Sequence, residues 1–175
     1  MQVKIKKLHS EVNLPVYKTI GAACADIQAF FKYKSLDEIM CIPNKEYTYK
    51  RVYDYYDEKE EKVCLEKLVL CPGDRMLIPT SICMEIPEGY EIVIRPRSGL
   101  AFKESLLVVT GTIDCDYRGE IFISVYNNSK RDFITINNLD RIAQVKFQKA
   151  EQCEFIEGEL SDTERGDGGF GHTGK

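Results

Sequence analysis

The fold class is decided by residues 72–94, which read PGDRMLIPTSICMEIPEGYEIVI. Two runs rich in apolar residues, Arg75–Ile86 and Tyr90–Ile94, are separated by the triplet Pro87-Glu88-Gly89 and preceded by Pro72-Gly73-Asp74. Proline presets φ at a turn position and glycine supplies positive φ, so both triplets are typical of tight turns. Apolar runs of this length between such turns indicate β-strands.

The same alternation of short apolar runs and turns continues along the chain. An N-terminal strand is expected around Val3, Ile5 and Leu8, and later strands are expected at Leu106–Val109, Ile121–Tyr126, Phe133–Ile136 and Ile142–Phe147. No long helical period competes with them, and only Ser35-Leu36-Asp37-Glu38 has the form of a capping box that opens one short helix. Many short strands with regular turns predict an all-β fold, a jelly roll or β-barrel.

Composition bounds the function classes. A chain of 175 residues with 43% hydrophobic and 30% charged residues fits one globular domain. The net charge of −4 argues against a broad nucleic-acid interface, although a few local arginines can still hold a triphosphate. No apolar run reaches the length of a membrane span, and the start lacks the apolar core of a signal peptide. We expect a protein that is not secreted and does not contact membranes, located in the cytoplasm, or in the nucleus of a eukaryote.

The cysteines and histidines do not indicate a metal centre. Seven cysteines are scattered without a C-x-x-C pair, and the only two histidines are His9 and His172. This spacing disfavours a structural zinc site and fits reduced thiols.

Residues 31–70 differ in amino-acid composition from the rest of the chain. They hold six of the ten tyrosines, at positions 33, 47, 49, 53, 55 and 56, and the charged run Asp57–Lys62. Tyr47, Tyr49, Tyr53 and Tyr55 would share one face of an extended strand, so an inserted β-hairpin with a charged tip is expected. A solvated surface insertion is the preferred interpretation, and an arm that binds a partner protein is the alternative.

The C-terminus also differs, because residues 161–175 contain five glycines and almost no apolar side chain. Such a segment cannot bury itself. We therefore expect a β domain over residues 1–160 and a flexible glycine-rich arm over residues 161–175.

Two internal segments carry residue types suited to phosphate chemistry. Arg97-Ser98-Gly99-Leu100 combines a charge, a hydroxyl donor and a backbone N–H that an anion can approach closely. In Gly111–Glu120, one of the two carboxylates that flank Cys115, Asp114 or Asp116, could take a proton from an attacking water, and Tyr117 could pack on a sugar or base. Taken alone, each segment is better interpreted as an ordinary turn.

A third segment lies in the arm. Arg165–Gly174 is glycine-rich, so its backbone can wrap an anion with N–H groups, while Arg165 could pair with a phosphate. A disordered tail is the alternative, but Phe170 speaks against it because a solvated linker gains nothing from an aromatic side chain.

Together and in this order, these segments resemble the motifs of the trimeric dUTP pyrophosphatase (dUTPase) family. The five matches are Ala22–Ala29, Pro96–Ala101, Gly111–Ile121, Asp140–Gln144 and Arg165–Gly174. The resemblance covers residues 1–30 and about 71–174, and the 31–70 insertion has no counterpart in short family members. It implies a distorted jelly roll of the dUTPase type and hydrolysis of dUTP to dUMP and pyrophosphate.

The resemblance also implies roles for the third motif. Asp114 would be the base that activates the attacking water. Tyr117 would pack under the deoxyribose and exclude a 2′-hydroxyl. The backbone of Gly111, Thr112 and Ile113 would read the uracil edge, and the tight hairpin would reject the methyl group of thymine.

The resemblance also implies that the phosphates are bound by Arg97, Ser98, Gly99 and Gln144. Arg141 would support the site from behind, and Asp26 would be structural or linked to the metal through water. Mg²⁺ would be held by the triphosphate and water, with no direct protein ligand.

The arm would close the site. By resemblance, Arg165 would neutralise charge on the leaving pyrophosphate. Phe170 would cover the uracil, Gly171 would lie beside the substrate, and His172 and Thr173 would meet the γ-phosphate. The family implies a homotrimer in which each active site is shared between subunits.

Two alternatives remain. A dCTP deaminase shares the fold, but that family has a catalytic glutamate where this chain has Ser124, and it prefers Arg-Ser-Ser over Arg97-Ser98-Gly99. The other alternative is a dUTPase with an additional regulatory role, through a protein partner at the 31–70 insertion.

Overall fold

The structure is a computed structural model, and it describes residues 1–35, 38–43, 52–59 and 62–169. Within this part of the chain it contains thirteen β-strands and one short helix, so the predicted all-β fold is confirmed. Strand pairing is antiparallel throughout the ladders formed by these residues.

The strands form four sheets. The sheet that carries most of the candidate site has the order β10 (Thr112–Ile113), β8 (Tyr90–Pro96), β13 (Arg141–Lys149) and β2 (Ala25–Gln28). A second four-stranded sheet has the order β3 (Met40–Ile42), β6 (Arg75–Pro79), β11 (Phe122–Asn127) and β9 (Leu106–Val108). The two smaller sheets are β1 (Lys4–Lys7) with β7 (Ile82–Glu85), and β12 (Ile134–Asn137) with β5 (Lys62–Leu70) and β4 (Val52–Asp57).

The core lies where the inner faces of these sheets meet. Along β11, Ile123 and Val125 are fully buried and alternate with partly exposed residues, as the two-residue period of a strand requires. Phe30 and Phe31, which follow β2, join the same apolar cluster. In the described part of the chain every buried side-chain nitrogen or oxygen has a hydrogen-bond partner.

The run 75–86, expected as one strand, is divided at Ser81. This residue has φ 53°, in the left-handed region that non-glycine residues rarely adopt, and it turns the chain from one sheet into another. Residues before it pair with β11 and residues after it pair with β1. Pro79, which ends β6, was given no weight as a break in this run, and the carboxylate that binds the Ser81 N–H comes from a distant segment.

The one α-helix of the described residues lies where no helix was expected. Helix α1 spans Ser98–Lys103, directly after β8, within the segment interpreted as a phosphate-binding turn.

The capping box predicted at Ser35–Glu38 is visible in part: the Glu38 carboxylate accepts a hydrogen bond from the Ser35 N–H at 2.7 Å. Leu36 and Asp37 lie outside the described residues.

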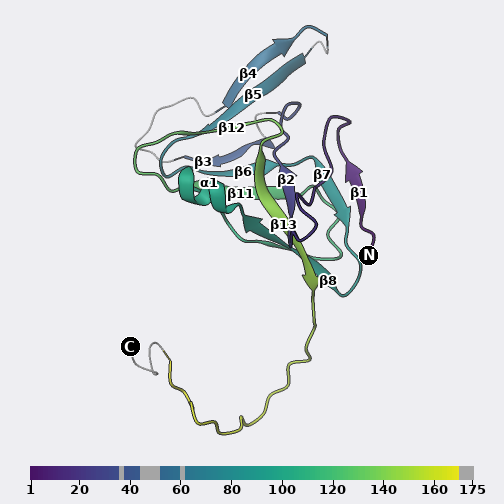
Figure 1. Ribbon diagram of the computed structural model, residues 1–175, viewed down its shortest axis with the longest axis vertical. Coiled ribbons are helices and arrows are strands. Elements are labelled where there is room, and N and C mark those ends of the chain that lie inside the picture. Colours follow the sequence, from purple (N-terminus) through teal and green to yellow (C-terminus); the bar gives the residue numbers. More distant parts are fainter. Residues whose placement is uncertain (36–37, 44–51, 60–61, 170–175) are drawn as a thin grey trace.

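The expected hairpin is formed by β4 and β5, which project from one end of the molecule (Figure 1). Tyr55 is 43% exposed, as a surface strand predicts, whereas Tyr47 and Tyr49 lie outside the described residues.

The inner half of β5 is different. Leu65, Leu68 and Leu70 are buried in the core, and β5 pairs there with β12, so this strand is part of the barrel rather than of a surface insertion.

The C-terminal segment leaves the body after β13 ends at Lys149. Residues 151–169 contain no strand or helix and run away from the sheets (Figure 1). The extended segment thus begins before Ser161, where the sequence analysis had set its start. Among the described residues, no helix has the length and apolarity needed to cross a membrane.

Candidate active site

Four residues singled out from the sequence meet at β2 and β13. The Asp26 carboxylate, on β2, is 6% exposed and accepts hydrogen bonds from Arg141 Nη1 and Gln144 Nε2, each at 2.9 Å. Arg97 Nε lies 3.6 Å from the same carboxylate. The strands bring them together because Gln144 on β13 is paired with both Asp26 on β2 and Arg95 on β8.

This group, which we call the Asp26 cluster, consists of Asp26, Arg97, Arg141 and Gln144. Arg97 Nη1 also donates to the Arg141 carbonyl at 2.6 Å. One carboxylate faces two guanidinium groups, so the cluster carries a net positive charge and can attract an anion. The side chains of Arg97 and Arg141 are 25% and 42% exposed, which leaves part of each accessible to a ligand.

Ser98 and Gly99 open helix α1 beside this cluster. Arg97 is the N-cap residue and its carbonyl accepts from the Ala101 N–H at 3.0 Å. The first N–H groups of a helix have no acceptor within the helix, so those of Ser98 and Gly99 remain available to an external acceptor.

The predicted uracil hairpin is formed by β10 and the turn that follows it. Thr112 and Ile113 pair with Val93 and Ile92 on β8, and the Gly111 carbonyl accepts from the Ile94 N–H at 2.8 Å. This pairing engages the Gly111 carbonyl.

Asp114 follows directly and is exposed at a pocket of about 450 Å³. Glu88, Glu91 and Asp116 line the same pocket, and no Lys or Arg of the described chain lines it. A triphosphate placed there would meet only negative charge from this chain. The described residues also contain no group of three His, Cys, Asp or Glu side chains that could hold a metal ion.

The Tyr117 ring lies against the backbone of its own turn. Its hydroxyl donates to the Glu120 carbonyl at 3.0 Å, and the residue is 44% exposed. A Cβ atom on Gly119 would lie 2.4 Å from the Tyr117 hydroxyl oxygen, so this ring position requires glycine there.

The hairpin and the Asp26 cluster are not brought together within one chain. Ile113 is opposite Ile92 on β8, whereas Gln144 is opposite Arg95, three residues further along the same strand. Three residues span about 10 Å along a strand and two strand spacings span about 10 Å across a sheet, which places the Cα atoms of Ile113 and Gln144 about 14 Å apart.

The arm residues are also apart from both groups. Arg165 Nε donates to the Gly168 carbonyl at 2.7 Å, within the arm itself. Phe170, Gly171, His172 and Thr173 lie outside the described residues.

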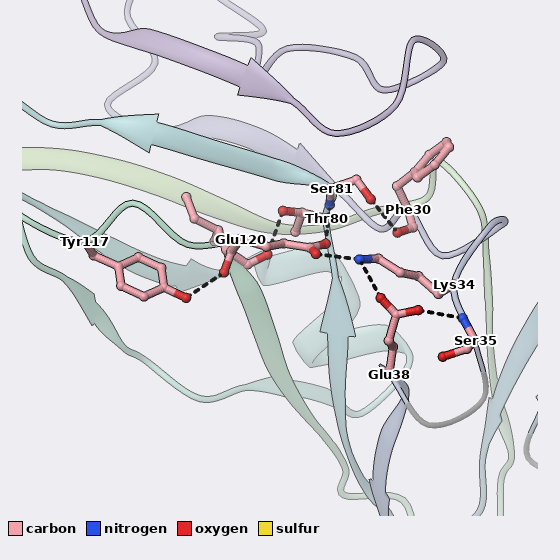
Figure 2. Close-up of polar contacts among 9 residues, drawn as sticks. Phe30, Lys34, Ser35, Glu38, Thr80, Ser81, Tyr117 and Glu120 are labelled. Atoms are coloured by element: carbon pink, nitrogen blue, oxygen red, sulfur yellow. Dashed lines mark hydrogen bonds and ion pairs between the residues drawn. The ribbon is translucent and has the colours of Figure 1, made fainter.

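Sequence analysis missed three residues that support the hairpin. Glu120 was quoted within a motif without a role, and Lys34 and Ser81 were not singled out. Figure 2 shows the three side by side, with the Glu120 carboxylate between the other two. A lone lysine and a lone serine far apart in sequence carry no pattern that would predict this contact.

Known proteins are similar to this chain in sequence and in fold. The family model described as dUTPase matches residues 62–174, more than half of the chain. The chain is a member of the dUTPase family. A deoxyuridine 5′-triphosphate nucleotidohydrolase of Nautilia profundicola is 41% identical over the whole of both chains. That of Finegoldia magna is 42% identical over 98% of this chain and 99% of its own.

Solved dUTPase structures share the fold. A single-residue mutant of the Staphylococcus bacteriophage 80alpha dUTPase, with dUpNHpp, has a TM-score of 0.73 at 22% identity and covers 99% of each chain. A mutant dUTPase of phage phi11 of S. aureus has a TM-score of 0.67 at 20% identity, over 93% of this chain and all of that one, and it is described as coordinating a structural Mg(II) ion. The match to the dUTPase model begins at Lys62 and therefore includes the whole of β5. The comparisons do not favour the dCTP deaminase alternative.

Proposed function

We propose that this dUTPase hydrolyses dUTP to dUMP and pyrophosphate in an active site assembled from the Asp26 cluster and the Asp114 hairpin. The observation that carries the proposal is that the two groups have complementary charge. The hairpin offers the exposed carboxylate of Asp114 in a pocket lined by four acidic residues, and the partly exposed ring of Tyr117 three residues further along the same turn. The Asp26 cluster offers the positive charge that this pocket lacks.

Asp114 is the base of the proposed reaction. Its carboxylate takes a proton from water, which attacks the α-phosphorus and displaces pyrophosphate. Asp114 is exposed and lines the pocket, so water and substrate can reach it.

Tyr117 and the β10 backbone select the nucleoside. The Tyr117 ring, fixed by its hydrogen bond to the Glu120 carbonyl, packs under the deoxyribose and leaves no space for a 2′-hydroxyl. Gly111, Thr112 and Ile113 present backbone groups to the uracil edge. A site built for those groups discriminates strongly against bases with the wrong donors and acceptors.

The Asp26 cluster and the start of α1 bind the phosphates. Arg97, Ser98, Gly99 and Gln144 contact them, while Asp26 and Arg141 hold these contacts in place. Gln144 donates to Asp26 through Nε2, which fixes the orientation of its side-chain amide.

In this proposal Mg²⁺ binds together with the substrate. The Asp26 carboxylate is already occupied by two arginines and a glutamine, which makes it a poor direct metal ligand. Triphosphate oxygens and water would hold the ion, with Asp26 reached only through water, and the ion would neutralise phosphate charge.

The active sites are shared between subunits of a homotrimer. Two features support this. The Cα atoms of Ile113 and Gln144 lie about 14 Å apart in the sheet. The extended arm also leaves Phe155, Ile156 and Leu160 96%, 83% and 93% exposed. In a trimer the arm can pack on another subunit and bring Arg165, Phe170, Gly171, His172 and Thr173 over its site. A regulatory protein partner, the additional role considered above, would bind at the 31–70 insertion.

The function is tested by pyrophosphate release from dUTP, dTTP, dCTP and UTP in parallel. Release from dUTP alone is expected, with no ammonia from dCTP. Asp114→Asn should lower kcat by about 10²–10⁴ while binding of a non-hydrolysable dUTP analogue stays nearly unchanged. Full kcat in Asp114→Asn would refute the assignment of the base.

A further inference from the structure

Glu120 connects the substrate hairpin to two other parts of the molecule. Its side chain is only 9% exposed, and its carboxylate accepts hydrogen bonds from the Ser81 N–H and from Lys34 Nζ, each at 2.6 Å (Figure 2). Its backbone carbonyl accepts the hydrogen bond from the Tyr117 hydroxyl at 3.0 Å. One residue therefore links Tyr117 to the corner between β6 and β7 and to the chain beyond β2.

The corner at Ser81 depends on this carboxylate. Ser81 is 3% exposed and has φ 53°, a conformation that persists in a non-glycine residue only where the surroundings enforce it. The Glu120 carboxylate satisfies the buried Ser81 N–H, and the Ser81 carbonyl accepts from the Leu8 N–H at 2.9 Å. Next to it, Thr80 Oγ1 donates to the Ile121 carbonyl at 2.6 Å. Two hydrogen bonds thus hold the Glu120 end of the Gly111–Glu120 hairpin against the buried residues Thr80 and Ser81.

Lys34 supplies the charge that balances this carboxylate. Its side chain is 14% exposed, and Nζ also lies 3.2 Å from Glu38 Oε1. Burial by itself lowers the pKa of Lys34, but the hydrogen bonds and charges of Glu120 and Glu38 outweigh it and raise the pKa, so the ammonium stays charged. A buried carboxylate that loses its cation is strongly disfavoured.

We propose that Glu120 is a positioning residue for Tyr117, and that Lys34 keeps Glu120 in place and so couples the segment beginning at residue 31 to nucleotide selection. The inference rests on the proposed role of Tyr117 at the deoxyribose. When Lys34 is removed, the Glu120 carboxylate turns toward solvent, its carbonyl shifts, and the Tyr117 hydroxyl loses its acceptor.

The first experiment compares Lys34→Met with the parent protein. The expected result is a rise of about tenfold in KM for dUTP, the factor that corresponds to about 1.4 kcal/mol, with kcat within a few-fold. The preference for dUTP over UTP should fall by a similar factor. Lys34→Arg, which keeps a cation on a long stem, should restore most of both values.

Lys32→Met is the matched control. Lys32 lies two residues away on the same segment and pairs with Glu11 at 3.5 Å. Among the interactions of the described residues, its side chain makes no contact with the Gly111–Glu120 hairpin. It should leave KM and the preference for dUTP unchanged. An equal effect of Lys32→Met and Lys34→Met would show a general loss of packing and overturn the proposal.

A double-mutant cycle separates positioning from stability. Lys34→Met and Tyr117→Phe act on the same hydrogen bond, so their effects on the dUTP preference should be strongly non-additive. Additive effects would contradict the proposal. If Lys34→Met fails to fold, Glu120→Gln takes its place in the cycle, since its amide can still accept from Ser81 but cannot pair with Lys34.

Tyr117→Ala distinguishes the inference from the function beneath it. If Tyr117→Ala keeps the full preference for dUTP over UTP, the proposed role of Tyr117 is wrong. If that preference is lost in Tyr117→Ala but intact in Lys34→Met, the role of Tyr117 stands and the positioning role of Lys34 and Glu120 is wrong.

Discussion

Arg141 on β13 donates to the buried carboxylate of Asp26 on the neighbouring strand β2 at 2.9 Å. The same carboxylate holds Gln144 at 2.9 Å and lies 3.6 Å from Arg97. Asp26 is thus the common support of three side chains that are proposed to contact or support the phosphates. It organises the phosphate site without needing to touch the substrate.

Asp26→Asn should therefore lower kcat/KM for dUTP by about 10-fold. Hydrogen bonds to charged groups contribute about 1.5–3 kcal/mol, and the partial exposure of both arginines reduces the loss to the lower end of that range. Steady-state kinetics measure the effect. Glu85→Gln, which alters an exposed ion pair with Lys4, is the control and should be neutral. Unchanged kinetics in Asp26→Asn would show that the arginines do not depend on it.

Gly119→Ala should weaken nucleoside selection without unfolding the protein. The added Cβ would lie 2.4 Å from the Tyr117 hydroxyl, so the ring must move. The preference for dUTP over UTP should fall about fivefold, a change of about 1 kcal/mol. Competition between the two nucleotides measures it. Gly21→Ala, where an added Cβ meets nothing within 4 Å, should have no effect. A preference that survives in Gly119→Ala would show that the ring position does not matter.

Stability should depend on Glu38 in acid. The hydrogen bond from the Ser35 N–H, followed by that from Lys34, lowers the pKa of Glu38 below its ordinary value of 4.5. Its contribution is present above that value and is lost as the pH falls through the lower folded-state pKa. Because the side chain is 48% exposed, the contribution should stay below about 1 kcal/mol. Urea unfolding from about pH 7 to about pH 3 should show a smaller acid loss in Glu38→Gln than in the parent, and equal losses would contradict the assignment.

The inner half of β5 should behave as core. Leu65 is 2% exposed, so Leu65→Ala should lower the free energy of unfolding by about 2–5 kcal/mol. Tyr55→Ala, on the outer half of the hairpin and 43% exposed, should change it by less than about 0.5 kcal/mol. Chemical denaturation compares the two. Similar small losses would mean that the whole hairpin is a surface insertion.

The strands and turns could be predicted because each is encoded locally, as at Pro87-Glu88-Gly89, where Gly89 adopts φ 77°. The corner at Ser81 could not, because its stabilising carboxylate comes from Glu120, thirty-nine residues away in sequence. Helix α1 was missed because its short sequence has no acidic residue in the first turn and no side-chain cap. The site residues were selected through ordered motifs and remain predictions. The structure does bring four of them together in the Asp26 cluster, because the strand register places Gln144 opposite Asp26.

Shared active sites are the central claim, and subunit mixing tests them most directly. Asp114→Asn and Arg165→Ala are each expected to leave the assembled protein nearly inactive, and the two variants are mixed in equal amounts and allowed to reassemble. If each site takes Asp114 from one subunit and Arg165 from another, about a quarter of the sites should recover both groups, and pyrophosphate release from dUTP should rise to about a quarter of the parent rate. Activity that stays at the level of the single variants, with subunit exchange confirmed independently, would contradict the account.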